Sequence, residues 1–250
     1  MRAYWALVCR ELGSHFFSWT GYVIIAAVLF LIGFSFASML KGLNGMATPV
    51  PVTQLFYDTL YFWLILLVVS PVITMRSFAL EKSSGTYETL MTTPVGEAQV
   101  VLAKFSGALI FYLIMWLPLL GCLLAVRTYS SEPAAMDAGA VAATFLGILL
   151  LGGLYMAMGM FASAITRSQI IAAMVALALG LSLFMLSFLG SALPSDAGWV
   201  AELVSYFALM EHMRDFAQGV VDTRPLVFYF TLTALFLVLT WKVVESRRWK

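Results

Sequence analysis

Six apolar stretches, each long enough to cross a membrane, constrain the fold of this chain more than any other feature. A helix needs about 20 apolar residues to cross the hydrocarbon core of a bilayer. The stretches that meet this requirement cover residues 20–40, 56–75, 101–126, 138–165, 169–193 and 226–244. We therefore predict an all-α membrane protein with six transmembrane helices, folded as one domain over residues 1–250.

Composition excludes the main soluble classes. Hydrophobic residues make up 62% of the chain and charged residues 11%, and a soluble domain of this size could not cover so much apolar surface. The formal net charge of +1 gives no reason to expect nucleic acid as a partner. The bilayer lipid is therefore the first partner that the sequence predicts.

The placement of lysine and arginine predicts the orientation of the spans. With the N-terminus inside, the inner segments hold ten of these residues and the outer segments four, which is the bias expected of cytoplasmic loops. The inner residues are Arg2, Arg10, Arg76, Lys82, Lys104, Arg167, Lys242, Arg247, Arg248 and Lys250. We expect a multi-pass protein of the inner (cytoplasmic) membrane with both termini in the cytoplasm.

Residues 1–17 form an amphipathic pattern before the first span. Trp5 and Phe16 fall on an apolar helical face, whereas Arg2 and Arg10 fall on the opposite side. A helix lying in the membrane interface has this pattern, with tryptophan at headgroup depth and arginine toward water. The alternative is a simple cytoplasmic extension of the first span.

A second amphipathic stretch, within residues 194–224, precedes the last span on the outer side. Met210, Met213 and Phe216 share its apolar face, and Gly219 provides a break after it. Irregular backbone at membrane depth must be covered by protein or line a cavity. We predict a re-entrant segment whose gate candidates are these four residues; the alternative is an interfacial loop that only covers the bundle.

A polar run within the cytoplasmic loop 76–100 is the most patterned segment on the inner side. Gly85 followed by Thr86 and Glu88 resembles a helix start, with Thr86 as a candidate cap, and Pro94 ends that helix. Little else of the chain is exposed on this side. We predict that a partner docks here, and the alternative is an ordinary solvated loop.

Sequence motifs for chemistry are absent from the chain. It has neither a GxxxxGK[ST] phosphate loop nor an HExxH metal motif. His15 and His212 are expected on opposite sides of the membrane, so they cannot share a metal. Ionisable residues are nearly missing from the cores of the spans, which disfavours an ion-coupled transporter. No catalytic residue, metal or cofactor is predicted in this chain.

The motif Arg76-x4-Glu81-x3-Gly85-Thr86-x-Glu88-x-Leu90-x3-Pro94-x9-Lys104 resembles the cytoplasmic signature of type-2 ABC transporter permeases. The similarity is closest to the gliding-motility type of permease subunit. The opening Arg10-Glu11-Leu12 and the outer run over residues 211–222 are similar to that subgroup as well. The resemblance therefore extends over nearly the whole chain.

This resemblance implies a type-2 ABC exporter permease architecture with an N-terminal interfacial helix. Two permease subunits would pair, as a homodimer or a heterodimer, and each would bind a separate ABC ATPase that holds ATP and Mg. Residues 81–94 would form the coupling helix in a groove of that ATPase. Its docking residues would be Glu81, Gly85, Thr86, Glu88, Leu90 and Pro94. An extracytoplasmic component is a further candidate partner.

Two other functions remain open at this point. A non-transporting membrane scaffold could anchor an ATPase or a surface apparatus of the gliding type. A membrane enzyme is the third class, and the chain offers no catalytic constellation for it. Few buried charges favour a lipid-linked, hydrophobic or polymeric cargo over a small ion.

Overall fold

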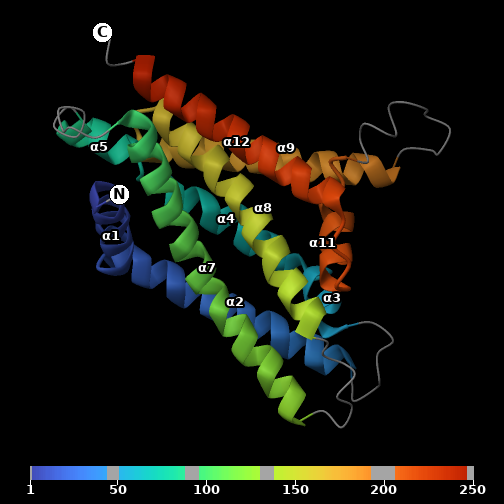
Figure 1. Cartoon of the computed structure of the whole chain (residues 1–250). Helices are drawn as coiled ribbons and strands as arrows, with labels where there is room; N and C mark the ends of the chain where they lie inside the picture. The colour runs from blue at the N-terminus through green and yellow to red at the C-terminus, as the bar shows by residue number, and fades with distance from the viewer. Residues whose placement is uncertain (1, 44–50, 88–95, 130–137, 193–205, 247–250) are drawn as a thin grey trace.

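The computed structural model is a bundle of α-helices (Figure 1). It describes residues 2–43, 51–87, 96–129, 138–192 and 206–246, and these parts contain no β-strand. Six helices in them are long and apolar enough to cross a membrane, which confirms the predicted fold class. Their bounds are α2 Trp19–Leu43, α4 Leu60–Thr74 (continuing toward α5), α7 Glu97–Tyr129, α8 Ala138–Ile165, α9 Gln169–Ala192 and α12 Thr223–Ser246.

The second span begins later than the sequence predicts. Residues 52–57 form a separate short helix, α3 Val52–Tyr57, and α4 begins only at Leu60. Between them Thr59 has an extended backbone, and its hydroxyl donates a hydrogen bond of 2.6 Å to the Phe56 carbonyl. The predicted start at residue 56 is therefore wrong, because this turn divides the apolar stretch.

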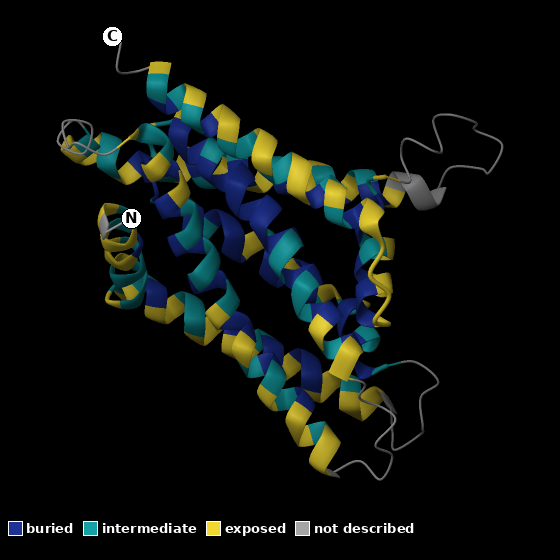
Figure 2. Ribbon diagram, viewed as in Figure 1, coloured by how far each residue is buried: buried dark blue, intermediate teal, exposed yellow. Residues whose placement is uncertain are grey.

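Helix α8 is the centre of the bundle. It contacts α4, α7, α9, α12 and the outer helix α11 Leu209–Ala217, and Figure 2 shows buried residues concentrated along it. Its glycines allow neighbours to approach closely. A Cβ on Gly152 would lie 2.0 Å from the Tyr112 ring, and one on Gly159 would lie 2.0 Å from the Thr74 hydroxyl. The small residues of this span therefore serve tight packing.

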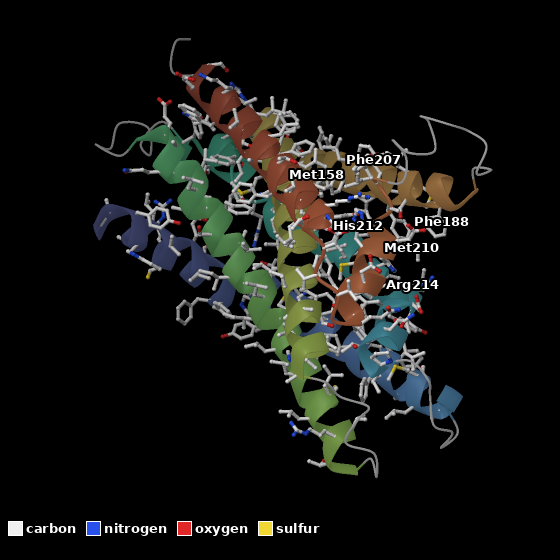
Figure 3. All side chains as sticks on the ribbon, turned by 45° about the vertical axis from the view of Figure 1, so that its right-hand side comes forward. Met158, Phe188, Phe207, Met210, His212 and Arg214 are labelled. Carbon is white, nitrogen blue, oxygen red and sulfur yellow. The ribbon has the colours of Figure 1, made fainter. Side chains whose placement is uncertain are left out.

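The two ends of the bundle hold different short helices. The N-terminal helix α1 Arg2–Phe16, the short helix α5 Ala79–Ser84 and the C-terminal end of α12 lie at one end (Figure 1). Helices α3 and α11 lie at the opposite end, and Figure 3 labels Met210, His212 and Arg214 on α11. We call these the inner and the outer end, following the predicted orientation.

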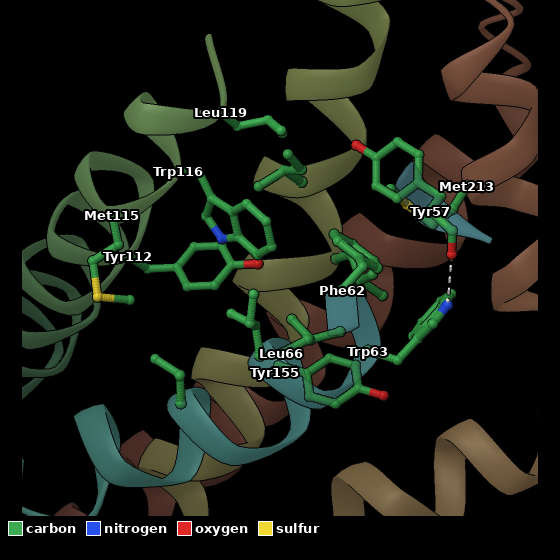
Figure 4. Packing of buried hydrophobic residues seen from close by; sticks show 14 of the residues in the cluster. Tyr57, Phe62, Trp63, Leu66, Tyr112, Met115, Trp116, Leu119, Tyr155 and Met213 are labelled. Carbon is green, nitrogen blue, oxygen red and sulfur yellow. Dashed lines mark hydrogen bonds between the residues drawn. The ribbon is translucent and has the colours of Figure 1, made fainter. Parts of the chain in front are cut away.

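Aromatic side chains fill the space between α3, α4 and α7 (Figure 4). The rings of Phe62 and Trp116 lie 5.3 Å apart, and those of Tyr57 and Phe62 lie 4.5 Å apart. The Trp63 indole donates a hydrogen bond of 3.2 Å to the Tyr57 carbonyl. Close-packed interiors of this kind transmit displacements instead of absorbing them. The bundle is therefore a firm body to which the short helices at its ends are attached.

Candidate functional site

Helix α1 packs against the inner half of α7. The hydroxyls of Tyr4 and Ser106 lie 2.7 Å apart, and the rings of His15 and Phe16 each lie 5.0 Å from the Phe111 ring. Gly107 allows this approach, because a Cβ there would lie 2.9 Å from a side chain of α1. Helix α1 is therefore joined to the bundle along its length.

The predicted apolar face of α1 is divided between protein and surroundings. Val8 is buried against α7 and Phe16 is half-buried, whereas Trp5 is 60% exposed. Arg10 is exposed, and the side chain of Arg2 lies outside the described residues. The exposed tryptophan suits an interfacial helix, whose position in the membrane stays a prediction.

A four-residue ion cluster joins α1, α5 and α7 at the inner end. The Lys104 ammonium lies 2.9 Å from Glu11 Oε1 and 2.7 Å from Glu81 Oε1. The Arg10 guanidinium lies 3.1 Å from the same Glu11 oxygen and 3.6 Å from that of Glu81. Two cations and two carboxylates make the cluster neutral overall.

The Lys104 side chain is the buried member of this cluster, with 3% of its surface exposed. A buried ammonium without partners is very costly, and the two carboxylates offset that cost. Burial by itself raises the pKa of the Glu11 carboxyl, but the attraction of Lys104 and Arg10 outweighs it and leaves the pKa below its ordinary value of 4.5. The carboxylate form of Glu11 is therefore part of the folded structure.

The ion cluster is a feature that the sequence interpretation missed. Lys104 and Glu81 stand in the predicted signature, and Arg10-Glu11 stands in the predicted opening, but nothing in one sequence shows that they meet. The usable signal is the position of Lys104, which lies within the predicted third span. A lysine there needs an acidic partner, and Glu11 and Glu81 are acids expected at the same depth.

Helix α5 is also attached to α8. The Ser163 hydroxyl oxygen accepts hydrogen bonds of 3.0 Å from the amides of Phe78 and Ala79, at the start of α5. The same hydroxyl donates a 3.0 Å bond to the Met75 carbonyl at the end of α4. The Lys82 ammonium donates to the carbonyl of the residue after Ser163. A displacement of α5 therefore acts directly on the inner end of α8.

The predicted coupling helix is divided at Gly85. Helix α5 ends there with φ +75°, a left-handed conformation that favours glycine, so Glu81 belongs to a helix before this break. Gly85 and Thr86 are exposed, and Thr86 begins a further helical turn. The Thr86 hydroxyl lies 2.9 Å from that of Ser84. The break agrees with the predicted helix start at Thr86, but it places Glu81 in α5 and rules out one continuous helix from residue 81; Glu88, Leu90 and Pro94 lie outside the described residues.

Arg76 connects three segments beside this site. Its guanidinium donates hydrogen bonds to the hydroxyls of Ser18 and Thr20 at the elbow between α1 and α2, and to the Gln169 side chain at the start of α9. Gly21 makes the elbow tight, because a Cβ there would lie 1.8 Å from a carbonyl oxygen in the last turn of α1. Arg76 itself lies between α4 and α5. Its hydrogen bonds therefore link the inner ends of α1, α2, α4, α5 and α9.

The outer gate candidates have two kinds of environment. Met213 and Phe216 are buried against α8, where a Cβ on Gly147 would lie 3.0 Å from each side chain. Met210 is half-buried, and its amide donates a 3.3 Å hydrogen bond to a serine hydroxyl of α9. Gly219 is exposed and follows the end of α11 with φ +84°. The gate role of these residues stays a prediction.

Polar contacts fix α11 to α3 across the outer end. Arg214 Nε lies 3.1 Å from Asp58 Oδ1, and the Thr53 hydroxyl donates a 2.8 Å bond to the Ala217 carbonyl. His212, on the same helix, has a pKa lowered by burial, which favours the neutral imidazole. Within the described ranges, no group of His, Cys, Asp or Glu could hold a metal ion.

Comparison with known proteins gives one family. A family model described as ABC-2 family transporter protein matches residues 48–242, which is most of the chain. The matched range begins just before α3 and includes α5, the buried lysine of the ion cluster and α11. No curated protein matches the chain.

Proposed function

Since this chain belongs to the ABC-2 transporter family and is a membrane permease component of an ABC transporter, we propose that it is driven by a separate ATPase docked at its inner end. ATP and Mg would bind in that ATPase. Two permease subunits would pair, the complex would export its substrate, and both termini would be cytoplasmic. The resemblance to the gliding-motility type stays part of this proposal.

The attachment of α5 to the rest of the bundle is the observation that carries the proposal. A docking helix can drive transport only if its displacement reaches the spans. Lys104 connects α5 to α1 and α7, and Ser163 connects it to α4 and α8. A force applied at α5 would therefore act on four helices at once.

The residues of the predicted docking segment divide into two roles. Glu81 points to Lys104, so its role in coupling is to position α5. Gly85 and Thr86 are exposed beyond the end of α5 and are free to meet a partner. Docking by Glu88, Leu90 and Pro94 stays a prediction about residues that the structure does not describe.

At the outer end, α11 supports the proposed gate. Its side chains Met213 and Phe216 are inserted beside Gly147 of α8, the same helix that holds α5 at its inner end through Ser163. A shift of α8 would therefore change the packing of Met213 and Phe216 against α8, and with it the position of α11. This connection is what favours a moving permease over a static scaffold.

Purification of the tagged chain from its native membrane in mild detergent, followed by mass spectrometry, tests the proposal. We expect an ATPase with a phosphate loop to accompany the chain in a near equal amount. Thr86→Arg should abolish its recovery, because the bulky charge lies in the exposed docking segment. Ser246→Arg, at the exposed inner end of α12, is the matched control and should leave recovery unchanged.

Two outcomes would oppose the proposal. Recovery of the chain without any ATPase, under conditions that preserve other ABC complexes, would remove its basis. The second outcome is an ATPase that is recovered with the chain but hydrolyses ATP at the same rate whether the chain is unaltered or carries Lys104→Met. The ATPase would then be anchored without being coupled, which would favour the scaffold.

A further inference from the structure

The outer ends of α7 and α8 enclose a groove of about 350 Å³. Its walls include Leu120, Leu124 and Arg127 from α7, and Ala138, Ala142 and Phe145 from α8. In both helices these residues stand at spacings of four and three, so each set forms one stripe along a helical face. Seven residues of helix extend the groove over about 10 Å.

The shape of the groove comes from unequal side chains on its two walls. The stripe on α7 presents leucines, whereas the facing stripe on α8 presents Ala138 and Ala142, which leave space. Leu124, Ala138 and Ala142 are exposed in the single chain, so the groove opens to the surroundings of the bundle. Both helices are long and apolar enough to span the membrane, so we expect the groove to open to lipid.

Arg127 is the charged residue among those that form the groove. It lies two residues before the end of α7, which is the depth of the lipid headgroups at that end of a spanning helix. Its guanidinium makes no ion pair with another described side chain. An arginine fork binds phosphate oxygens in a bidentate way.

We propose that this groove binds an anionic glycerophospholipid, with one acyl chain between α7 and α8 and the phosphate on Arg127. The apolar part of the groove matches the acyl chain of such a lipid, and the arginine at its end matches the phosphate. The volume lies at the lower end of the range for small-molecule pockets, about 300–1,000 Å³.

The binding site is separate from the coupling site. It lies at the opposite end of α7 from Lys104, and no residue of the ion cluster or of α11 lines it. A lipid in it would fill the space between the outer ends of α7 and α8. The test therefore measures lipid binding and does not depend on transport.

The full chain, reconstituted in lipid nanodiscs, can be probed with a phosphatidylglycerol whose acyl chain carries a photoactivatable group. We expect cross-links within residues 120–127 and 138–145, and competition by unlabelled phosphatidylglycerol but not by phosphatidylcholine. Ala142→Trp, which fills the groove, should reduce these cross-links at least tenfold. Arg127→Gln should reduce them severalfold.

Matched variants make the result specific. Ala125→Trp adds the same bulk to an exposed alanine of α7 outside the groove, and Arg224→Gln removes another exposed arginine. Both should leave the cross-links unchanged. Cross-links spread evenly over the lipid-facing helices, equal competition by phosphatidylcholine, or full labelling of both Arg127→Gln and Ala142→Trp would each overturn the proposal.

Discussion

Replacing Lys104 by methionine should destabilise the inner end of the protein more than any other single loss of charge there. Methionine keeps the length and apolar stem of lysine but leaves Glu11 and Glu81 facing each other with one half-exposed arginine. The neutral cluster then carries an excess negative charge in a site where Glu11 and Glu81 are only 12% and 18% exposed.

The expected cost follows from this burial. Removing one partner of a buried ion pair costs about 3–5 kcal/mol, and the partial exposure of both carboxylates places the loss near the lower limit. For a chain of this size, 3 kcal/mol corresponds to a fall of about 6–12 °C in the midpoint of thermal unfolding. Glu11→Gln combined with Glu81→Gln in the Lys104→Met background removes the excess charge and should recover most of this loss.

The pH dependence of stability provides a second, independent test of the role of Lys104. In the unaltered protein the pKa of Glu11 is lowered, so its contribution to stability is complete above about pH 4.5 and is lost as the pH falls through the folded value. Without Lys104, burial and the neighbouring Glu81 should raise that pKa. The variant should therefore gain stability as the pH falls toward about 4.5, whereas the unaltered protein should begin to lose stability only below that pH.

Tryptophan fluorescence during heating of the purified chain in detergent measures both effects, and the chain offers a matched control. Lys242 and Glu245 form a pair with the same 2.7 Å separation as Lys104 and Glu81, but at an exposed position. Lys242→Met should change stability by less than about 1 kcal/mol. Equal unfolding midpoints for Lys104→Met and Lys242→Met, with no recovery in the triple variant, would refute the reasoning.

Three further changes have defined outcomes in the same unfolding assay. Ser163→Ala removes the acceptor of two amides at the start of α5 and should cost about 1–3 kcal/mol. Gly152→Ala places a Cβ against the Tyr112 ring and should cost about 1–3 kcal/mol through overpacking. Asp58→Asn breaks the exposed contact with Arg214 and should cost less than about 1 kcal/mol, because the pair is solvated.

These three outcomes can be contradicted separately. Gly33 has open space around it, so Gly33→Ala is the control for Gly152→Ala and should not lower the midpoint. Equal effects of the two glycine changes would show that the contact with Tyr112 does not restrict α8. An unchanged midpoint for Ser163→Ala would show that α5 is held by other contacts. A loss of stability above about 2 kcal/mol for Asp58→Asn would contradict the prediction, because an exposed ion pair contributes less than that.

The spans were predictable because membrane crossing depends on a property that a single sequence displays directly. The stretch over residues 138–165 becomes α8 with the predicted bounds, since small and apolar residues fill it from end to end. The second span shows the limit of this reasoning. Phe56 and Tyr57, the last residues of α3, are apolar enough to merge with it, and only Asp58 and Thr59 signal the turn that makes α3 a helix of its own.

The ion cluster could not be predicted from the sequence because its members come from three distant segments. Lys104 contributes to the count of inner positive charges whether it points to water or into protein, and Glu81 has the same place in the signature in either case. Their meeting depends on how α1 packs along α7, which rests on contacts such as the Gly107 approach. Such packing follows from the shape of surfaces, and hydrophobic periodicity does not encode it.

Helix α8 offers the shortest physical connection between the two predicted functional ends. Ser163 at its inner end holds α5, and Gly147 at its outer end receives α11; sixteen residues of helix separate them by about 24 Å. Adjacent glycines such as Gly152 and Gly153 commonly allow a helix to bend. Here the Tyr112 ring occupies the space beside Gly152, so a bend toward α7 would require that ring to move. A bend of α8 toward α7 is therefore disfavoured, and a push at α5 would reach α11 most directly by a shift of α8 along its whole length.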